Sequence, residues 1–206
     1  FGTLTVLTEI SIKVLPKPPS NKTLIINSPH LKKALEFLRL ALSSSSDPSG
    51  GVFYPEYFKN HFTFNDLTIK GPITAIRIEG LNQSVEYRIT KLREELKVDN
   101  NEHVILETEQ SNIFWEKTKC LQVFSELKNN LIRIVVPPSE SFDIINKLKI
   151  YNVKYFIDWG GNLIWVQLDN ISLKTLRDIK EFVVKASGYL TVIKIEENLK
   201  ASVDIF

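Results

Sequence analysis

A short stretch near the C-terminal end, Asp158-Trp159-Gly160-Gly161-Asn162, carries side chains that a simple turn does not need. Runs of β-branched and aromatic residues flank it at 153–157 and 163–168, which predicts a β-hairpin with this stretch as its turn. The glycines supply positive φ, and asparagine tolerates the left-handed region. The carboxylate could assist proton removal or hydrogen-bond its own turn. The two indoles, Trp159 and Trp165, could wall a pocket or pack in a core.

Other reactive side chains are few and scattered. The three histidines, His30, His61 and His103, fall in unrelated predicted elements without ligand spacing, so we predict no metal site. Cys120 has no C-x-x-C partner, and its apolar neighbours on a predicted helix indicate an inert small hydrophobe. The sequence contains neither a glycine-rich phosphate loop nor a nucleophile elbow.

Composition limits the classes of partner. The chain has 206 residues, 43% of them hydrophobic, and a formal net charge of +2, which is too mild to indicate a nucleic-acid or membrane surface. No apolar run reaches spanning length, so we predict no transmembrane segment. A single cysteine fits a reducing compartment. The chain contains no methionine and opens in a strand-like pattern at Phe1, so we expect it to be part of something longer.

The first half of the chain alternates predicted strands and helices after a proline-rich linker. Even-numbered apolar residues predict a strand over 3–14, and the prolines of 15–19 end it. Helical spacing of leucines predicts a helix over 29–42, after a short strand at 23–27. The remaining predicted elements are a strand at 73–79, a helix at 83–96, a strand at 103–108 and an additional helix at 110–126.

The second half repeats this order. A strand at 131–136 is followed by a helix that Pro137-Pro138 opens, then by the hairpin. Ser172 is the predicted N-cap of a further helix, and the last strand covers 190–195. The predicted fold is α+β, with two ferredoxin-like βαββαβ units of antiparallel sheet and helices on one face. RNA-binding domains share this unit, but the Lys/Arg-Gly-Phe type of run that marks them is missing.

Several segments together resemble the FAD-binding subunit of bacterial glycolate oxidase, a relative of the vanillyl-alcohol-oxidase type of FAD-linked oxidase. The matching segments run from residue 2 to about 195, and each is weak alone. They are Gly2-Thr3-Leu4-Thr5-Val6-Leu7-Thr8-Glu9 with Lys13-Val14-Leu15-Pro16, Pro48-Ser49-Gly50, Arg77-Ile78-Glu79-Gly80 with Ser84-Val85 and Arg88, Ile132-Arg133 to Pro137-Pro138, and Asp158-Trp159-Gly160-Gly161 with Ile164-Trp165.

The resemblance implies a division of the chain and an activity. Residues 1–19 would be the last strand of an FAD-binding domain plus its linker, and 20–206 the cap, or substrate domain, with half-units at about 20–108 and 128–196. The implied activity is oxidation of glycolate or a related 2-hydroxy acid by hydride transfer to FAD. The implied partners are a second flavoprotein subunit and an iron–sulfur subunit. The implied location is cytoplasmic, or peripheral to the inner membrane through those subunits.

The resemblance also suggests roles for individual residues. Arg133, Arg77 or Asp158 could act on the substrate, because guanidinium pairs with a carboxylate through two parallel hydrogen bonds. A structural ion pair with Glu79 or Asp158 is the commoner role of such an arginine. Pocket candidates are Trp159, Trp165 and Tyr54, and cofactor contacts through the backbone are assigned to Gly2, Thr3 and Val6.

Departures from the family pattern leave a second interpretation open. Most of the flavin domain, with its glycine-rich pyrophosphate loop, is missing from this sequence, and Thr5 and Ile132 stand where the family commonly has glycine and tryptophan. We therefore expect the chain alone to be inactive. The alternative is a non-catalytic interaction or regulatory module that retains the cap fold without a flavin domain.

Overall fold

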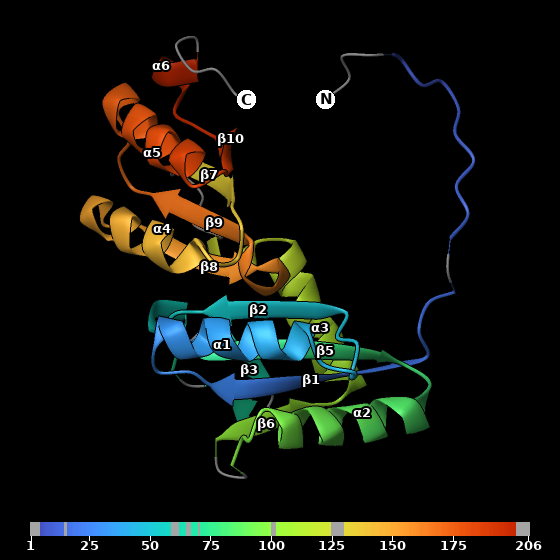
Figure 1. Ribbon diagram of the computed structural model, residues 1–206. Helices are drawn as coiled ribbons and strands as arrows, with labels where there is room; N and C mark the ends of the chain where they lie inside the picture. The colour runs from blue at the N-terminus through green and yellow to red at the C-terminus, as the bar shows by residue number, and fades with distance from the viewer. Residues whose placement is uncertain are drawn as a thin grey trace.

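Eight antiparallel strands form one continuous sheet in the computed structural model, in the order β10-β7-β9-β8-β2-β5-β1-β6 (Figure 1). The structure describes residues 5–14, 16–58, 62–64, 67–69, 71–99, 102–124 and 130–200. The sheet divides into two sets of four strands with the same connectivity. Within each set the spatial order is fourth, first, third, second, which is the order of a ferredoxin-like unit. The predicted α+β class and the antiparallel sheet are confirmed.

The first unit runs from residue 20 to residue 106. Its strands and helices, in chain order, are β1 Ser20–Asn27, α1 Leu31–Leu42, β2 Gly50–Tyr54, β5 Ile73–Gly80, α2 Asn82–Glu95 and β6 His103–Leu106. A short 3-10 helix, Glu56–Phe58, and a two-stranded hairpin, β3 Thr63–Phe64 with β4 Leu67–Thr68, lie between β2 and β5. Strand β2 was missed by the pattern because Val52 to Tyr54 are buried on both faces, which removes the alternation.

The second unit follows an extra helix, α3 Thr108–Lys119, and a 3-10 turn, Gln122–Phe124. The predicted helix over 110–126 ends early because Leu121 takes a left-handed conformation with φ 53°. The elements of the unit are β7 Asn130–Val135, α4 Ser141–Leu148, a 3-10 turn Lys149–Tyr151, β8 Lys154–Asp158, β9 Leu163–Leu168, α5 Leu173–Lys185, β10 Tyr189–Lys194 and α6 Glu197–Lys200. Ser172 caps α5 as predicted, accepting a hydrogen bond from the Thr175 amide at 3.0 Å.

Helices α1, α2, α4 and α5 cover one face of the sheet, as predicted (Figure 1). The extra helix α3 lies on the other face, where Phe114 packs with Tyr54 and Phe156 in a separate core. Neighbouring strand residues therefore point into different cores: Phe53 packs under α1 and α4, and Tyr54 packs under α3. The helices of the two units therefore all lie on one face of the sheet. Helix α3, which belongs to neither unit, forms a second layer on the other face.

The two units meet where β2 pairs with β8, through Phe53 and Ile157. Continuing this register would place Pro55 opposite Tyr155, and proline has no N–H to donate. The Tyr57 hydroxyl takes its place: it donates to the Tyr155 carbonyl at 2.7 Å and accepts from the Tyr155 amide at 2.5 Å. A side chain thus completes the ladder at the joint.

The strand predicted over 3–14 is not formed in the described part of that range. Residues 5–14 are extended, and apolar side chains such as Val6, Ile10 and Ile12 are at least 63% exposed. The prediction is wrong for this structure because the segment runs away from the sheet, where no strand offers it backbone partners (Figure 1). The assignment of 1–19 to a flavin domain stays a prediction.

Candidate functional site

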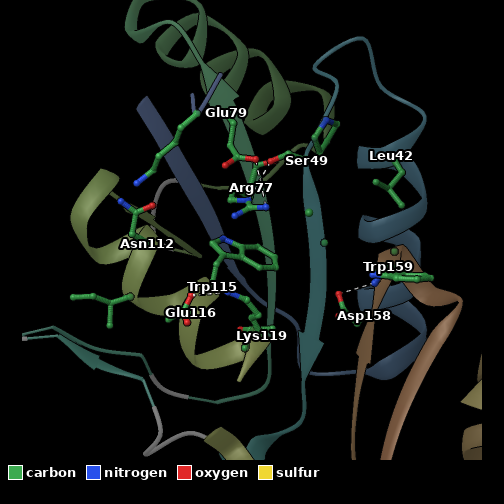
Figure 2. Close-up of a pocket in the computed structure, with 17 residues that line it drawn as sticks. Leu42, Ser49, Arg77, Glu79, Asn112, Trp115, Glu116, Lys119, Asp158 and Trp159 are labelled. Carbon is green, nitrogen blue, oxygen red and sulfur yellow. Dashed lines mark hydrogen bonds and ion pairs between the residues drawn. The ribbon is translucent and has the colours of Figure 1, made fainter. Parts of the chain in front are cut away.

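Three of the singled-out sequence segments meet in one cavity of about 900 Å³. The Pro48-Ser49-Gly50 loop, the Arg77-to-Glu79 end of β5 and the Asp158-Trp159-Gly160 turn all line it (Figure 2). Helix α3 supplies a further wall, and Leu42 of α1 and Lys17 complete the lining. Residues 48 and 160 are distant in the chain, so the sequence alone does not bring them together. The antiparallel pairing of β5 with β2, and of β2 with β8, does so.

Arg77 is held rigidly at the centre of the cavity. Its Nε donates to Ser49 Oγ at 3.1 Å, and its Nη2 lies 3.3 Å from Glu79 Oε2. The guanidinium also lies over the ring of Trp115, 4.9 Å from the centroid, which adds cation–π attraction (Figure 2). The predicted structural ion pair with Glu79 is therefore present. No partner of Nη1 occurs among the described residues, so that nitrogen can still donate to a ligand.

The Trp115 side chain, which stacks on Arg77, is itself held by a hydrogen bond and by close packing. Its indole N–H donates to Thr23 Oγ1 at 2.8 Å, and the Thr23 hydroxyl is 2.6 Å from Ser111 Oγ. Gly50 makes room for the ring, because a Cβ there would lie 3.1 Å from its Cη2 atom. The resulting network connects β1, β5 and α3 below the cavity and limits the rotation of Arg77.

Asp158 faces the cavity from the end of β8. Its Oδ1 accepts a hydrogen bond from the Trp159 amide at 2.7 Å, so one of the two predicted roles, bonding its own turn, is present. Burial raises the pKa of the Asp158 carboxyl above its ordinary value, while this hydrogen bond and the charge of Arg77 act to lower it. A carboxylate with a raised pKa accepts a proton more readily than an ordinary aspartate.

The turn after Asp158 differs from the expected hairpin turn. Trp159 has φ 50°, an uncommon value for a bulky residue, and Gly160 and Gly161 have φ 66° and 115°. The two glycines have the positive φ expected of them, whereas Asn162, which could tolerate the left-handed region, has φ −99°. The positive φ of Gly160 favours glycine at this position, and a Cβ there would also displace the end of the Leu42 side chain, whose Cδ1 would lie 1.7 Å away. The side chain of Trp159 remains 63% exposed.

Tyr54 lies beneath the cavity and does not line it. The ring is 1% exposed, and its hydroxyl donates to Thr118 Oγ1 at 3.0 Å, which in turn donates to the Phe114 carbonyl at 2.9 Å. Burial raises the pKa of the Tyr54 phenol well above its ordinary value, and the charge of Asp158 contributes to this rise. Tyr54 supports the floor of the cavity through Thr118.

Arg133 and Trp165 lie away from the cavity, in a row of side chains that crosses the strands on the α3 face. Tyr54 and Phe156 have ring centroids 4.9 Å apart, and Phe156 stacks on Trp165 at 6.4 Å. Trp165 is the direct cross-strand neighbour of Arg133 on β7. The structure therefore separates the predicted residues into two groups: Arg77, Asp158 and Trp159 at the cavity, and Tyr54, Trp165 and Arg133 in this row.

The prediction did not include the wall that α3 supplies. Asn112, Trp115, Glu116 and Lys119 line the cavity, and their spacing places them on one face of the helix. That spacing was visible in the sequence as a polar and aromatic stripe opposite Phe114. Of the predicted cofactor contacts, Gly2 and Thr3 lie outside the described residues, and Val6 is 86% exposed on the N-terminal segment.

Two further observations concern the described residues alone. They contain no group of three or more histidine, cysteine, aspartate or glutamate side chains that could hold a metal ion, and His61 lies outside them. None of the helices that they form combines the length and apolar character needed to cross a membrane.

Comparisons with known proteins support the fold. No protein-family model matches the sequence, and no curated protein matches it significantly. Among solved structures, 4-ethylphenol oxidase from Gulosibacter chungangensis aligns with a TM-score of 0.56 and 12% identity over 90% of this chain and 47% of that one. An alkyldihydroxyacetonephosphate synthase aligns with a TM-score of 0.54 and 14% identity over 85% of this chain and 41% of that one. The chain thus spans less than half of either structure, and the likeness is one of fold.

Proposed function

We propose that the chain is the cap, or substrate-side, portion of an FAD-dependent 2-hydroxy-acid oxidoreductase subunit of the glycolate oxidase type. One observation carries the proposal: three of the five segments that resemble that family, although far apart in the chain, line the same cavity. The pairing of β2 with β5 and β8 brings the polar side chains of all three segments to that one concave surface. The similar fold of part of an oxidase, 4-ethylphenol oxidase, is consistent with this proposal.

The residues of the cavity suit the two polar groups of a 2-hydroxy acid. Oxidation to the 2-oxo acid removes a hydride from the α-carbon and a proton from the hydroxyl group. Arg77 would bind the substrate carboxylate through Nη1, since Glu79 and Ser49 hold the rest of the guanidinium. Asp158, whose pKa burial raises, would take the hydroxyl proton.

The described residues at the cavity do not form a glycine cradle for FAD. At two of the glycines that line the cavity, the space of an absent side chain is already filled from within the chain, by Trp115 at Gly50 and by Leu38 at Gly51. FAD, the proposed hydride acceptor, would therefore be held mainly by a flavin domain outside this chain. The further proposed partners are a second flavoprotein subunit and an iron–sulfur subunit, and the proposed location is cytoplasmic or peripheral to the inner membrane.

The test uses the full-length flavin-containing protein. Anaerobic addition of 2-hydroxy acids should bleach the flavin absorbance, and Arg77→Met should raise the KM by about tenfold or more, because a charged hydrogen bond is lost. Arg177→Met, an exposed arginine on α5, is the matched control and should leave the KM unchanged. Flavin that no 2-hydroxy acid bleaches would contradict the proposal.

One observation favours the second candidate, a non-catalytic interaction module. Arg77 is already neutralised by Glu79, and Lys119 lies 3.5 Å from Glu116, so much of the charge at the cavity is internally paired. If the full-length protein binds no flavin while the cavity remains folded, this second function replaces the first.

A further inference from the structure

A second cavity, of about 490 Å³, lies on the helical face of the sheet where the two units meet. Helix α1 begins at this cavity, and Asn146 of α4 and Tyr155 of β8 border it. The helix spans about 18 Å, and its other end reaches the Arg77 cavity at Leu42. The N-terminal segment joins the sheet at Ser20, the opposite end of β1 from this cavity (Figure 1). The two cavities are therefore separate, and this one lies away from the segment that would lead to a flavin domain.

The N-terminus of α1, which opens on this cavity, has no side-chain cap. His30 is its N-cap residue but makes no side-chain hydrogen bond to the helix, and the first turn contains no acidic side chain. Ser28, a residue type that commonly caps helices, is buried instead, with its hydroxyl oxygen 2.8 Å from Thr74 Oγ1. No partner of the amides of residues 31–33 occurs among the described residues. These amides and the positive end of the helix dipole favour an anion at this position.

Tyr155 independently indicates a ligand. The residue is 9% exposed, and its phenol oxygen has no hydrogen-bond partner among the described residues. That oxygen is not fully enclosed, so it opens on the cavity that Tyr155 lines. The Tyr57 hydroxyl bonds to the backbone amide and carbonyl of Tyr155, which fixes the strand from which the ring projects. Burial raises the pKa of the Tyr155 phenol to about 12, so near neutral pH it is protonated and can donate a hydrogen bond.

The charged side chains around the cavity leave a small excess of positive charge. Lys32 has no ion-pair partner among the described residues, and Lys149 Nζ donates to Asn146 Oδ1 at 2.9 Å. Glu56 is the carboxylate of the described lining, and it already interacts with another group. Two lysines against one carboxylate suit a ligand with a single negative charge.

Apolar side chains form much of the remaining described lining. Phe53 and Pro55 lie near the joint of the units, Pro72 precedes β5, and Phe142 of α4 is 38% exposed. The volume is within the usual range for small-molecule pockets, roughly 300–1,000 Å³. An apolar surface beside a group of donors suits a ligand with an apolar body and an anionic end.

From these observations we infer that this cavity is a second binding site, which takes a small organic acid with one carboxylate and an apolar body. The amides at the start of α1 and the Tyr155 hydroxyl donate to the carboxylate, with Lys32 beside it. The apolar body lies against Phe53 and Phe142. The site goes beyond the proposed function, because it needs neither a flavin nor Arg77.

Amide NMR of the full-length protein tests binding at this site directly. The probes are cyclohexanecarboxylate, its neutral analogue cyclohexanecarboxamide, acetate and inorganic phosphate. Cyclohexanecarboxylate should move the amide proton signals of residues 31–33 downfield, because these amides gain an anionic acceptor. It should bind about tenfold more tightly than the carboxamide, which lacks the charge, and than acetate, which lacks the apolar body. The amide signals of Ser49 and Gly50 report any binding at the Arg77 cavity separately.

Two substitutions each remove one group from the site. Tyr155→Phe keeps the ring and the strand but removes the hydroxyl group, so the dissociation constant of cyclohexanecarboxylate should rise about tenfold. Lys32→Met removes one charge and should raise it by about threefold or more. Lys33→Met is the matched control, because Lys33 is exposed on the same turn of α1, pairs with Glu36 and does not line the cavity. It should leave the dissociation constant unchanged.

Lys32→Glu separates binding from stability. A carboxylate in the first turn interacts favourably with the helix dipole, so the melting temperature should stay the same or rise slightly. The same carboxylate repels an anionic ligand, so binding of cyclohexanecarboxylate should be lost.

Three outcomes would overturn the inference. Equal affinities for the carboxylate and the carboxamide would show that the site does not recognise an anion. Tighter binding of phosphate than of cyclohexanecarboxylate would assign the site to a different class of ligand. Equal losses in Lys32→Met and Lys33→Met would indicate a general effect of charge and not a contact at the site. None of these measurements depends on flavin reduction, so the proposed function stands or fails separately.

Discussion

Each ferredoxin-like unit carries an arginine in the pairing of its first and third strands, on the third strand in the first unit and on the first strand in the second unit. In the first unit Arg77 on β5 is the cross-strand neighbour of Thr23 on β1, and in the second unit Arg133 on β7 is the neighbour of Trp165 on β9. Both face the α3 side of the sheet. Arg77 is paired with Glu79 and covered by Trp115. The Nε atom of Arg133 is buried without a hydrogen-bond partner among the described residues.

The difference comes from one helix. Helix α3 lies over the first unit and brings Trp115, Glu116 and Lys119 to the edge of the sheet, which closes a cavity around Arg77. Arg133 does not line this cavity. The layer that α3 adds over the sheet thus determines which of the two arginines lines this cavity.

The largest expected change in stability is at the turn between α5 and β10 in the second unit. Lys97 and Ser187, which follow α2 and α5, are both left-handed, with φ 51° and 57°. The next residue is Val98 in the first unit and Gly188 in the second. A Cβ on Gly188 would lie 2.5 Å from the Val135 carbonyl oxygen and 2.4 Å from Val136 Cγ1, so Gly188→Ala should cost about 3 kcal/mol of unfolding free energy.

Chemical denaturation measures this change. Ser187→Gly is the control at the adjacent position, and it should be neutral or slightly stabilising because glycine tolerates the positive φ. A Gly188→Ala variant as stable as wild type would show that the turn after α5 accepts a side chain at this position, as the turn after α2 accepts Val98.

Substituting the two arginines by methionine tests the comparison directly. Arg77→Met leaves the half-buried Glu79 carboxylate without its cation and should cost about 1–2 kcal/mol. Arg133→Met removes a buried Nε atom that has no hydrogen-bond partner among the described residues, so stability should stay the same or rise slightly. Thermal denaturation of both variants measures the difference. Equal losses would mean that Arg133 is as well paired as Arg77.

The joint between the units depends on the hydroxyl group of Tyr57. Tyr57→Phe keeps the ring and removes both hydrogen bonds to the Tyr155 backbone, so it should cost about 1 kcal/mol. Hydrogen exchange of the Tyr155 amide should also accelerate. Tyr87→Phe, an exposed tyrosine on α2, is the control and should change neither quantity. An unchanged exchange rate in Tyr57→Phe would show that the joint is completed in another way.

The smallest expected effect is the pH dependence from Asp158. Burial raises its pKa in the native state above the unfolded value, so between those two values the native state binds more protons and stability falls as pH rises. Above this range, Asp158→Asn should be slightly more stable than wild type, since an amide oxygen can still accept from the Trp159 amide. Below it, the two proteins should be equally stable. Denaturation curves across acid pH measure this, and parallel profiles would contradict the raised pKa.

The sequence by itself determined the local structure and the unit topology. Apolar spacing located the hairpin strands, helices α2 and α5, and the Ser172 cap, because these depend on periodicity and on bonds within a few residues. It failed at β2, where burial on both faces hides the alternation, and at 3–14, where a strand pattern finds no partner in this chain. It correctly expected positive φ at the glycines of the turn, and it did not foresee the left-handed conformation of Trp159.

Only the tertiary structure decided which predicted residues lie together. Arg77 and Arg133 were equivalent in the sequence: each is an arginine on a strand with apolar neighbours. Their difference arises from cross-strand register and from the position of α3, which join residues about a hundred positions apart. The hairpin turn Asp158 to Gly161 was recognisable from its residues. That Asp158 faces Arg77 across a cavity follows from the pairing of β8 with β2, a long-range contact that local pattern cannot specify.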